Sequence, residues 1–280
     1  MDWRIWGRRR HPLVTVLRLA GVIGSLPARG GLTAEGLEPL IEKAFAPKQL
    51  TAVALIVNSP GGSPVQSGLI QQRIRSIALR KNVPVLVFVE DVAASGGYWL
   101  ACAGDEIFVN ENSIVGSIGV IASGFGFPEA LDKLGIERRV HTAGEHKGML
   151  DPFRPEDPEE VERLKGIQAE MHESFKSLVR SRRGKRLKAP EDELFTGAFW
   201  TGRRAVELGL ADAVGDLRTV VRDRFGPRVR FLVAEPRRGW LRRRIGMTGP
   251  EVDERDIGAG FARGLLSAVE ERLMWSRWGL

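Results

Sequence analysis

Short apolar runs and stretches with helical spacing alternate along the first half of the chain. The runs at Val14–Ile23, Ala52–Val57 and Val85–Val89 are rich in β-branched residues and are bounded by turn residues. They therefore predict three buried strands. Between the first two runs, Thr33 precedes an apolar stripe at helical spacing, which predicts a helix there.

Serine and glycine build the turns that follow the second and third of these strands. The first turn, Asn58–Gly62, leads into Ser63 and Pro64, which predict the start of a helix. The expected buried face of that helix consists of Val65, Leu69, Ile70, Ile74 and Ile77. The second turn, Ser95–Gly97, opens another helix. In a parallel sheet such turns lie at one edge, where open α/β folds bind their ligands.

Ser95 is the first candidate for chemistry. Gly96 and Gly97 leave the backbone beside its hydroxyl uncovered, and the first amides of the following helix face a developing negative charge. We expect this helix to end at Gly104. The residues alone leave two interpretations open, a nucleophile or an ordinary helix N-cap.

The second half of the chain predicts further strands at Glu106–Val109 and Glu137–His141, with a short helix at Leu131–Leu134 between them. A proline-rich acidic segment, Asp151–Glu160, then opens a long helix that continues to about Arg183. Its apolar stripe predicts core packing along the whole helix and consists of Val161, Leu164, Ile167, Met171, Phe175, Leu178 and Val179.

The order of these elements predicts an α/β fold of stacked βαβ units. We divide the chain into a basic N-terminal arm at residues 1–12, a catalytic domain at residues 13–235, and a basic amphipathic extension at residues 236–280. The 280 residues, 43% of them hydrophobic, are enough to bury a substantial core.

The amino-acid composition limits which cofactors the protein can hold and which cell compartment it can occupy. The only cysteine, Cys102, excludes an internal disulfide and cysteine-ligated zinc, and its place in the predicted helix favours a small buried residue over a reactive thiol. Leu13–Ile23 is too short and too charged to span a bilayer. We therefore expect no transmembrane segment, no metal or other cofactor, and a cytoplasmic protein.

The net charge of +7 comes from arginines concentrated toward the two ends, where five of the seven tryptophans also lie. In the extension, Ile257, Phe261, Leu265, Val269 and Leu273 form one stripe of a predicted amphipathic helix. Such a helix either contacts an anionic membrane peripherally, here the inner membrane, or packs on its own domain or a neighbouring subunit. No recognised motif for nucleic acid accompanies the charge, so we expect no nucleic-acid partner.

A serine nucleophile needs a base. None of the four histidines has an acidic neighbour at a spacing typical of a triad, so a Ser-His-Asp arrangement has no support. Lys147 is the other option, since a lysine buried beside the serine loses its charge and accepts a proton. Its pKa would have to fall by several units from about 10.4.

Five sequence blocks together resemble the signal peptide peptidase A family of serine peptidases. They are VNSPGG (57–62), ASGGYWLA (94–101), GSIGV (116–120), TAGEHK (142–147) and FTGAFWTGRRAVELGLAD (195–212). In that family the nucleophile is the serine of the SGG motif and the base is a lysine 52 residues later, which is the separation of Ser95 and Lys147.

The resemblance implies a role for each matching residue. Ser95 would be the nucleophile and Lys147 the general base, the amides of Gly62 and Gly96 would form the oxyanion hole, and the Ser117 hydroxyl would orient the lysine. It also implies the fold of the caseinolytic protease and crotonase superfamily. The caseinolytic relatives carry a histidine where this chain has the Gly-Ser-Ile-Gly-Val run, which favours the lysine base.

We expect the chain to depart from the family in lacking the common N-terminal transmembrane anchor and in having one copy of the catalytic unit. We therefore expect a homo-oligomer that cleaves extended apolar peptides such as remnant signal peptides. Two alternatives remain open from the sequence. One is a crotonase-like enzyme acting on an acyl thioester, which needs neither Ser95 nor Lys147, and the other is a catalytically silent scaffold that binds peptides at membranes.

Overall fold

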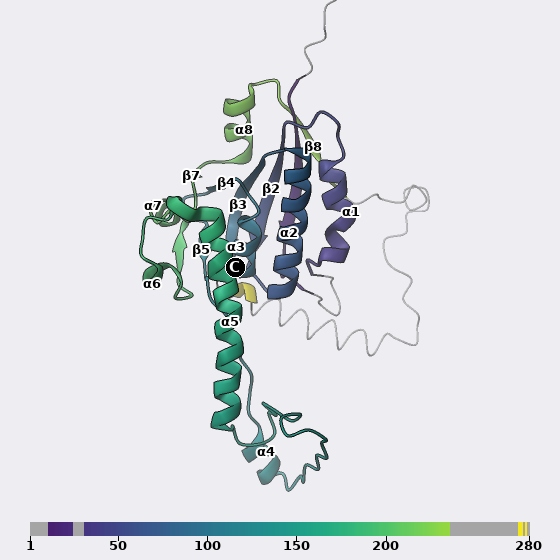
Figure 1. Ribbon diagram of the computed structural model, residues 1–280, viewed down its shortest axis with the longest axis vertical. Coiled ribbons are helices and arrows are strands. Elements are labelled where there is room, and N and C mark those ends of the chain that lie inside the picture. Colours follow the sequence, from purple (N-terminus) through teal and green to yellow (C-terminus); the bar gives the residue numbers. More distant parts are fainter. Residues whose placement is uncertain (1–10, 25–30, 236–273, 277, 279–280) are drawn as a thin grey trace, which may run out of the picture.

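The computed structural model describes residues 11–24, 31–235, 274–276 and 278 (Figure 1). Over these residues, strands and helices alternate to form one sheet with helices packed on it, which confirms the predicted α/β class. The expected amphipathic helix at 257–273 and residues 1–10 of the basic N-terminal arm lie outside the described residues. No described helix is long and apolar enough to cross a bilayer.

The described strands form an eight-stranded sheet in the order β6-β5-β3-β2-β1-β8, with β4 pairing β3 and β7. Their bounds are β1 Leu13–Ala20, β2 Ala52–Ser59, β3 Val85–Ala94, β4 Glu106–Val109, β5 Ile114–Gly116, β6 Phe199–Thr201, β7 Ala213–Val214 and β8 Arg230–Val233. All pairs are parallel except β5 with β6. The long β3 pairs β4 with its first half and β5 with its second, so it lies at the centre of the fold.

Eight α-helices and one 3₁₀ turn connect the described strands. Their bounds are α1 Ala34–Phe45, α2 Pro64–Lys81, α3 Gly96–Ala101, α4 Pro128–Lys133, α5 Pro158–Arg183, η1 Gly184–Arg186, α6 Glu191–Leu194, α7 Gly202–Glu207 and α8 Leu217–Phe225. Helices α1, α2 and α3 and the end of α5 contribute to the larger core on one face of the sheet. Helix α8 covers part of the opposite face through Val221, which packs with Phe88 and Phe108.

The described C-terminal residues return to the sheet beside the end of β3. Trp278 is buried in a small cluster with Val92 and Ala94, and its ring meets the Phe199 ring edge-on at 4.7 Å. Val92 and Ala94 flank Ala93, which belongs to the larger core. The tryptophan therefore packs on the face of the sheet opposite α1 and α2.

Several predicted elements differ from the structure. The strand expected at Glu137–His141 is wrong, because these exposed residues lie in a segment with no neighbouring strand to pair with. The helix after Ser95 ends at Ala101 rather than Gly104. Gly104 instead fits a tight space, since a Cβ there would lie 2.6 Å from the Val87 side chain.

Two predicted buried faces are only partly buried. Val65 and Leu69, expected in the buried face of α2, are exposed, whereas Ile70, Ile74 and Ile77 are buried as predicted. In α5 the buried residues are Phe175, Val179 and Arg183, all in the C-terminal third. In the N-terminal part of the stripe Ile167 and Met171 are exposed and Val161 and Leu164 are half-buried, because α5 extends away from the sheet (Figure 1).

Candidate active site

Ser95 lies on a strained turn between β3 and α3. Its backbone has φ +51° and ψ −119°, a conformation that residues other than glycine rarely adopt. Two bonds hold this turn, from the Ser95 amide to the Gly116 carbonyl at 2.8 Å and from the Trp99 amide to the Ser95 carbonyl at 3.0 Å. The Ser95 side chain makes no capping bond to α3. The interpretation of Ser95 as an ordinary N-cap therefore has no support.

The Gly61–Gly62 turn packs directly against the Ser95 turn. Both glycines have positive φ, and a Cβ on Gly61 would lie 2.9 Å from both the Ser95 Cβ and the Gly96 nitrogen. A Cβ on Gly96 would lie 3.3 Å from the Gly62 nitrogen. Only glycines allow the two turns to approach this closely.

This packing brings beside the serine two backbone amides for which the described part of the chain offers no hydrogen-bond acceptor. Ile23 bonds the Gly61 carbonyl and the Ser63 amide, which leaves the Gly62 amide outside that ladder. The Gly96 amide is the first of α3 and so has no partner within the helix. The structure thus brings Ser95, Gly62 and Gly96 together in an arrangement that suits a tetrahedral oxyanion.

Ser117 lies in a second turn beside Ser95. It is buried, it has φ +53°, and it follows Gly116, whose carbonyl accepts the Ser95 amide bond. The Ser117 amide donates to the Ala198 carbonyl at 2.7 Å, and the Gly119 amide donates to the Ser117 carbonyl at 3.0 Å. The structure therefore places Ser117 next to the Ser95 turn, and the orienting role that the resemblance implies for its hydroxyl stays a prediction.

Lys147 lies elsewhere. It is exposed, in the segment between α4 and α5 that Figure 1 shows at the end of α5 away from the sheet. That segment is fastened to the start of α5, because Arg154 bonds both the Gly148 carbonyl and Glu160. Glu160 and Phe175 are separated along α5 by a rise of about 22 Å. Since Phe175 packs on Trp99 of α3, one chain does not bring Lys147 to Ser95.

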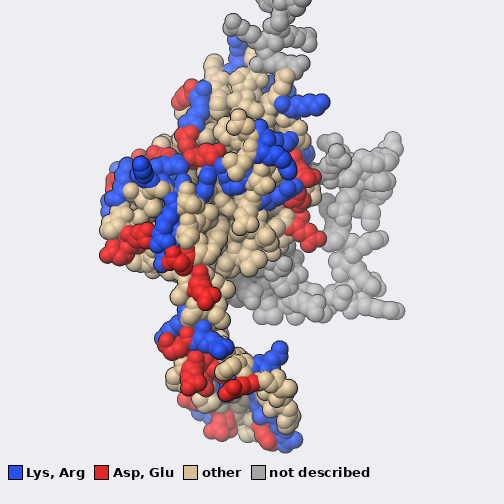
Figure 2. Space-filling view, viewed as in Figure 1, with Lys and Arg blue, Asp and Glu red and all other residues tan. Residues whose placement is uncertain are grey.

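Residues 121–171 project from the body of the molecule, and from here on 'the arm' means this segment and not the basic N-terminal residues. It exposes an unusual number of large apolar side chains, namely Ile121, Phe125, Phe127, Leu134, Ile136, Val140, Leu150, Phe153, Ile167 and Met171. Figure 2 shows charged side chains of both signs interspersed among uncharged ones on this part of the molecule. An exposed apolar surface of this kind is typical of an interface.

The helix that follows Ser95 is packed as core. Tyr98 is fully buried and donates its hydroxyl to the Leu210 carbonyl at 2.8 Å. Burial raises the pKa of the Cys102 thiol to about 12, so the thiol is neutral at physiological pH. Both side chains therefore support α3 and do not take part in chemistry.

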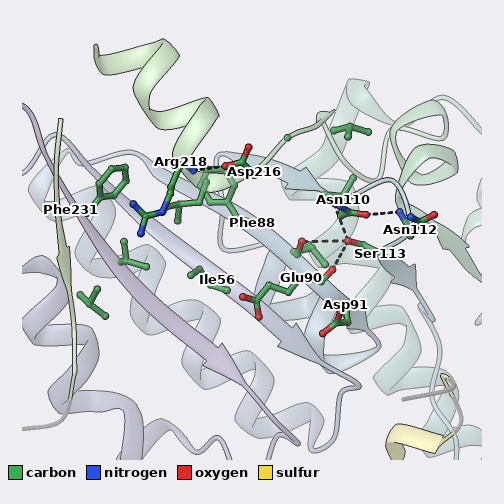
Figure 3. A pocket seen from close by; sticks show the side chains of 17 residues that line it. Ile56, Phe88, Glu90, Asp91, Asn110, Asn112, Ser113, Asp216, Arg218 and Phe231 are labelled. Atoms are coloured by element: carbon green, nitrogen blue, oxygen red, sulfur yellow. Dashed lines mark hydrogen bonds between the residues drawn. The ribbon is translucent and has the colours of Figure 1, made fainter. Parts of the chain in front are cut away.

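A hollow of about 840 Å³ lies on the face of the sheet opposite α1 and α2. Figure 3 shows Ile56, Phe88 and Phe231 along it, with Glu90 and Arg218 also lining it. None of the five predicted site residues lines this hollow. It is therefore separate from the turns around Ser95.

One contact near Ser117 was not foreseen from the sequence. His172 of α5 places its Nε2 atom 3.0 Å from the Ile118 carbonyl oxygen. The two residues are 54 positions apart, and no local pattern connects them.

Comparison with known proteins adds a family match. The model of peptidase family S49 matches residues 77–224, more than half of the chain. The chain is 48% identical over 272 residues to the Na(+)/H(+) antiporter NhaA of Brucella abortus, covering 95% of this chain and 37% of that protein. It is 31% identical over 216 residues to the chloroplastic serine protease SPPA of Arabidopsis thaliana, covering 74% and 31%.

A third similar protein is protease 4 of Haemophilus influenzae, at 32% identity over 186 residues, covering 65% of this chain and 29% of that protein. The chain thus spans about a third of the length of each of these relatives.

Proposed function

Because the chain belongs to peptidase family S49, we propose that it is a serine endopeptidase with Ser95 as nucleophile and Lys147 as general base. One observation carries the proposal. Ser95 lies on a strained strand-to-helix turn, its side chain makes no capping hydrogen bond to α3, and the amides of Gly62 and Gly96, which have no acceptor in the described part of the chain, lie beside it. A crotonase-like enzyme would use the amides but would not need this serine.

The chemistry follows from that arrangement. Neutral Lys147 accepts the Ser95 proton as Oγ attacks the amide carbonyl, and the Gly62 and Gly96 amides stabilise the oxyanion, each by about 3 kcal/mol. When the carbon–nitrogen bond breaks, the protonated lysine returns its proton to the leaving amine. Water then attacks the acyl-enzyme and gives a proton to Lys147. When the ester bond breaks, the protonated lysine returns that proton to Ser95 Oγ, which releases the acid and restores both the serine hydroxyl and the neutral lysine.

We propose that the dyad forms between two copies of the chain, the arm of one copy bringing Lys147 to Ser95 of another. The separation of about 22 Å along α5 supports this arrangement over a dyad within one chain. The apolar side chains of the arm supply a surface for the contact. In a closed homo-oligomer every Ser95 would receive a Lys147 from a neighbouring copy.

The deciding experiment mixes two inactive variants. Wild type, Ser95→Ala and Lys147→Ala are assayed with a fluorogenic apolar peptide from pH 6 to 10, alone and after the variants are dissociated and reassembled together. Each variant alone should be inactive. A random one-to-one mixture should recover about a quarter of the wild-type activity, since one site in four pairs an intact serine with an intact lysine.

Each other outcome rejects a specific part of the proposal. A mixture that stays inactive while the wild type cleaves places the dyad within one chain. Activity that survives in Lys147→Ala overturns the base, and activity in Ser95→Ala overturns the nucleophile. A wild type without turnover at any pH overturns the peptidase proposal itself.

We further propose that the substrates are extended apolar peptides, such as remnants of signal peptides, and that the protein works on the cytoplasmic side of a membrane. The similarity to a Brucella antiporter supports contact with a membrane, because an antiporter operates in a membrane. Flotation with anionic liposomes at low salt tests it. Protein that stays at the bottom of the gradient, with or without residues 237–280, rejects the membrane contact.

A further inference from the structure

The His172 side chain contacts the turn that carries Ser117, with its Nε2 atom 3.0 Å from the Ile118 carbonyl oxygen. A carbonyl oxygen only accepts hydrogen bonds, so the His172 Nε2 atom must carry the proton that bonds Ile118. His172 itself is half-buried, whereas Ile118 is fully buried. A lost bond at this position would leave a backbone carbonyl without its partner in the interior.

The Gly116–Gly119 turn is fastened from three separate elements. The Ser95 amide bonds the Gly116 carbonyl, the Ala198 carbonyl accepts from the Ser117 amide, and His172 bonds the Ile118 carbonyl. Ser117 needs this support because its positive φ is unfavourable for a residue with a side chain. Of the three attachments, only the one from His172 is made by a side chain.

His172 also marks the place where α5 leaves the body of the molecule. Phe175, Val179 and Arg183 are buried on the C-terminal side of it, and no residue of α5 on its N-terminal side is buried. The helix then continues into the arm that carries Lys147. The His172 side chain therefore joins the point where α5 leaves the body to the turn that carries Ser117.

We propose that His172 is a positioning residue, whose Nε2–H holds the Ile118 carbonyl and thereby fixes the Ser117 hydroxyl for its contact with the base. The role rests on the proposed Ser-Lys function, in which Ser117 orients Lys147. His172 itself touches no reacting atom. It acts through the backbone of the turn, so its loss lowers kcat and leaves KM unchanged.

The test compares His172→Leu with His172→Gln. Leucine fills a similar space without a donor, while glutamine carries an amide donor the same number of bonds from Cα. His172→Leu should lower kcat about tenfold with KM unchanged, and His172→Gln should stay within about threefold of wild type. In a Ser117→Ala background, His172→Leu should add less than a twofold loss, because the residue works through Ser117.

Equal losses in the leucine and glutamine variants would overturn the proposal, as would a full tenfold loss in the Ser117→Ala background. Hydrogen–deuterium exchange gives a readout that does not depend on activity. The Ser117 and Gly119 amides should exchange faster in His172→Leu and at the wild-type rate in His172→Gln. Unchanged exchange in His172→Leu rejects the role of His172 even if the protein is a peptidase. If the mixture of Ser95→Ala and Lys147→Ala stays inactive, the dyad between copies is rejected, but the exchange measurement still tests the role of His172.

Discussion

Positive φ angles gather around Ser95. Gly61, Gly62, Ser95, Gly116 and Ser117 all have them, and these residues come from three turns that meet at one edge of the sheet. Backbone strain of this kind persists where the surrounding structure over-determines it, and it is concentrated at functional sites. We therefore expect the strained conformations of Ser95 and Ser117 to be needed because they hold the three turns at their present separation.

A substitution at Gly61 tests whether the Gly61–Gly62 turn and the Ser95 turn must stay this close. In Gly61→Ala the new Cβ would lie 2.9 Å from the Gly96 nitrogen and force the two turns apart. Peptide hydrolysis should fall at least about 100-fold through loss of the oxyanion hole. The matched control is Gly68→Ala in α2, whose Cβ would come no closer than 3.8 Å to Trp99 and which should remain fully active. A fully active Gly61→Ala protein would show that the contact is dispensable.

Cys102 predicts a pH dependence of stability. Its thiol pKa is about 12 in the folded protein because of burial, whereas an unfolded chain loses the proton near pH 8.5. Between these values the unfolded state binds fewer protons, so this group lowers the free energy of unfolding by about 1.4 kcal/mol per pH unit. Urea unfolding at pH 9 and 10 should show a shallower fall for Cys102→Ala than for wild type. Parallel curves would mean that the thiol is accessible to solvent in the folded state.

At this scale the sequence was most informative where local chemistry decides the conformation. The strand, the serine and the following glycines predicted the turn at Ser95. The resemblance assigned roles to Gly62, Gly96 and Ser117, and the structure places all three close to that turn. The bond from His172 to Ile118 could not be predicted. It depends on how α5 packs beside α3 and the Ser117 turn, which no spacing along the chain encodes.

Helix α5 shows what periodicity can and cannot predict. One continuous stripe of apolar residues extends along the helix, but only Phe175 and Val179 of that stripe are buried. A stripe reports that a face is apolar and does not report what covers it. The predicted strand at Glu137–His141 failed for a related reason, since an extended segment becomes a strand only beside another strand.

The two halves of α5 should therefore respond differently to truncation. Phe175→Ala removes a buried ring that lies 4.7 Å from the Trp99 ring, and it should lower the free energy of unfolding by about 3 kcal/mol or more. Ile167→Ala, at an exposed position of the same helix, should change it by less than about 0.5 kcal/mol. Urea unfolding at low protein concentration measures both. Equal losses would mean that the arm packs on the body of its own chain.

At the scale of the whole molecule, the sheet and the arm place the two proposed catalytic groups apart. The class of the fold followed from the alternation of apolar runs and helical stretches, whereas the order of the strands in the sheet was not predicted. The projection of the arm did not, because the sequence around Lys147 has the composition of an ordinary loop. A single copy therefore has the proposed nucleophile beside the proposed oxyanion-hole amides, while the proposed base lies apart from them.

The apolar side chains of the arm predict how that incomplete site is completed. Ile121, Phe125 and Leu134 are 70%, 82% and 71% exposed, and replacing all three by serine removes apolar area without touching Ser95 or Lys147. If the arm docks on another copy, the triple variant should sediment as a monomer at micromolar concentration and lose peptidase activity. Its folded body should be unaffected, as judged by the urea unfolding of the monomer.

The matched control for this variant replaces exposed apolar side chains on the body. Val65 and Leu79 of α2 are 65% and 69% exposed, so the double serine variant removes a similar kind of surface outside the arm. It should keep the wild-type mass in sedimentation and the wild-type activity. A triple variant that keeps the mass of the wild type would show that another surface holds the copies together. A triple variant that becomes monomeric yet stays active would show that one chain completes the dyad by moving its arm.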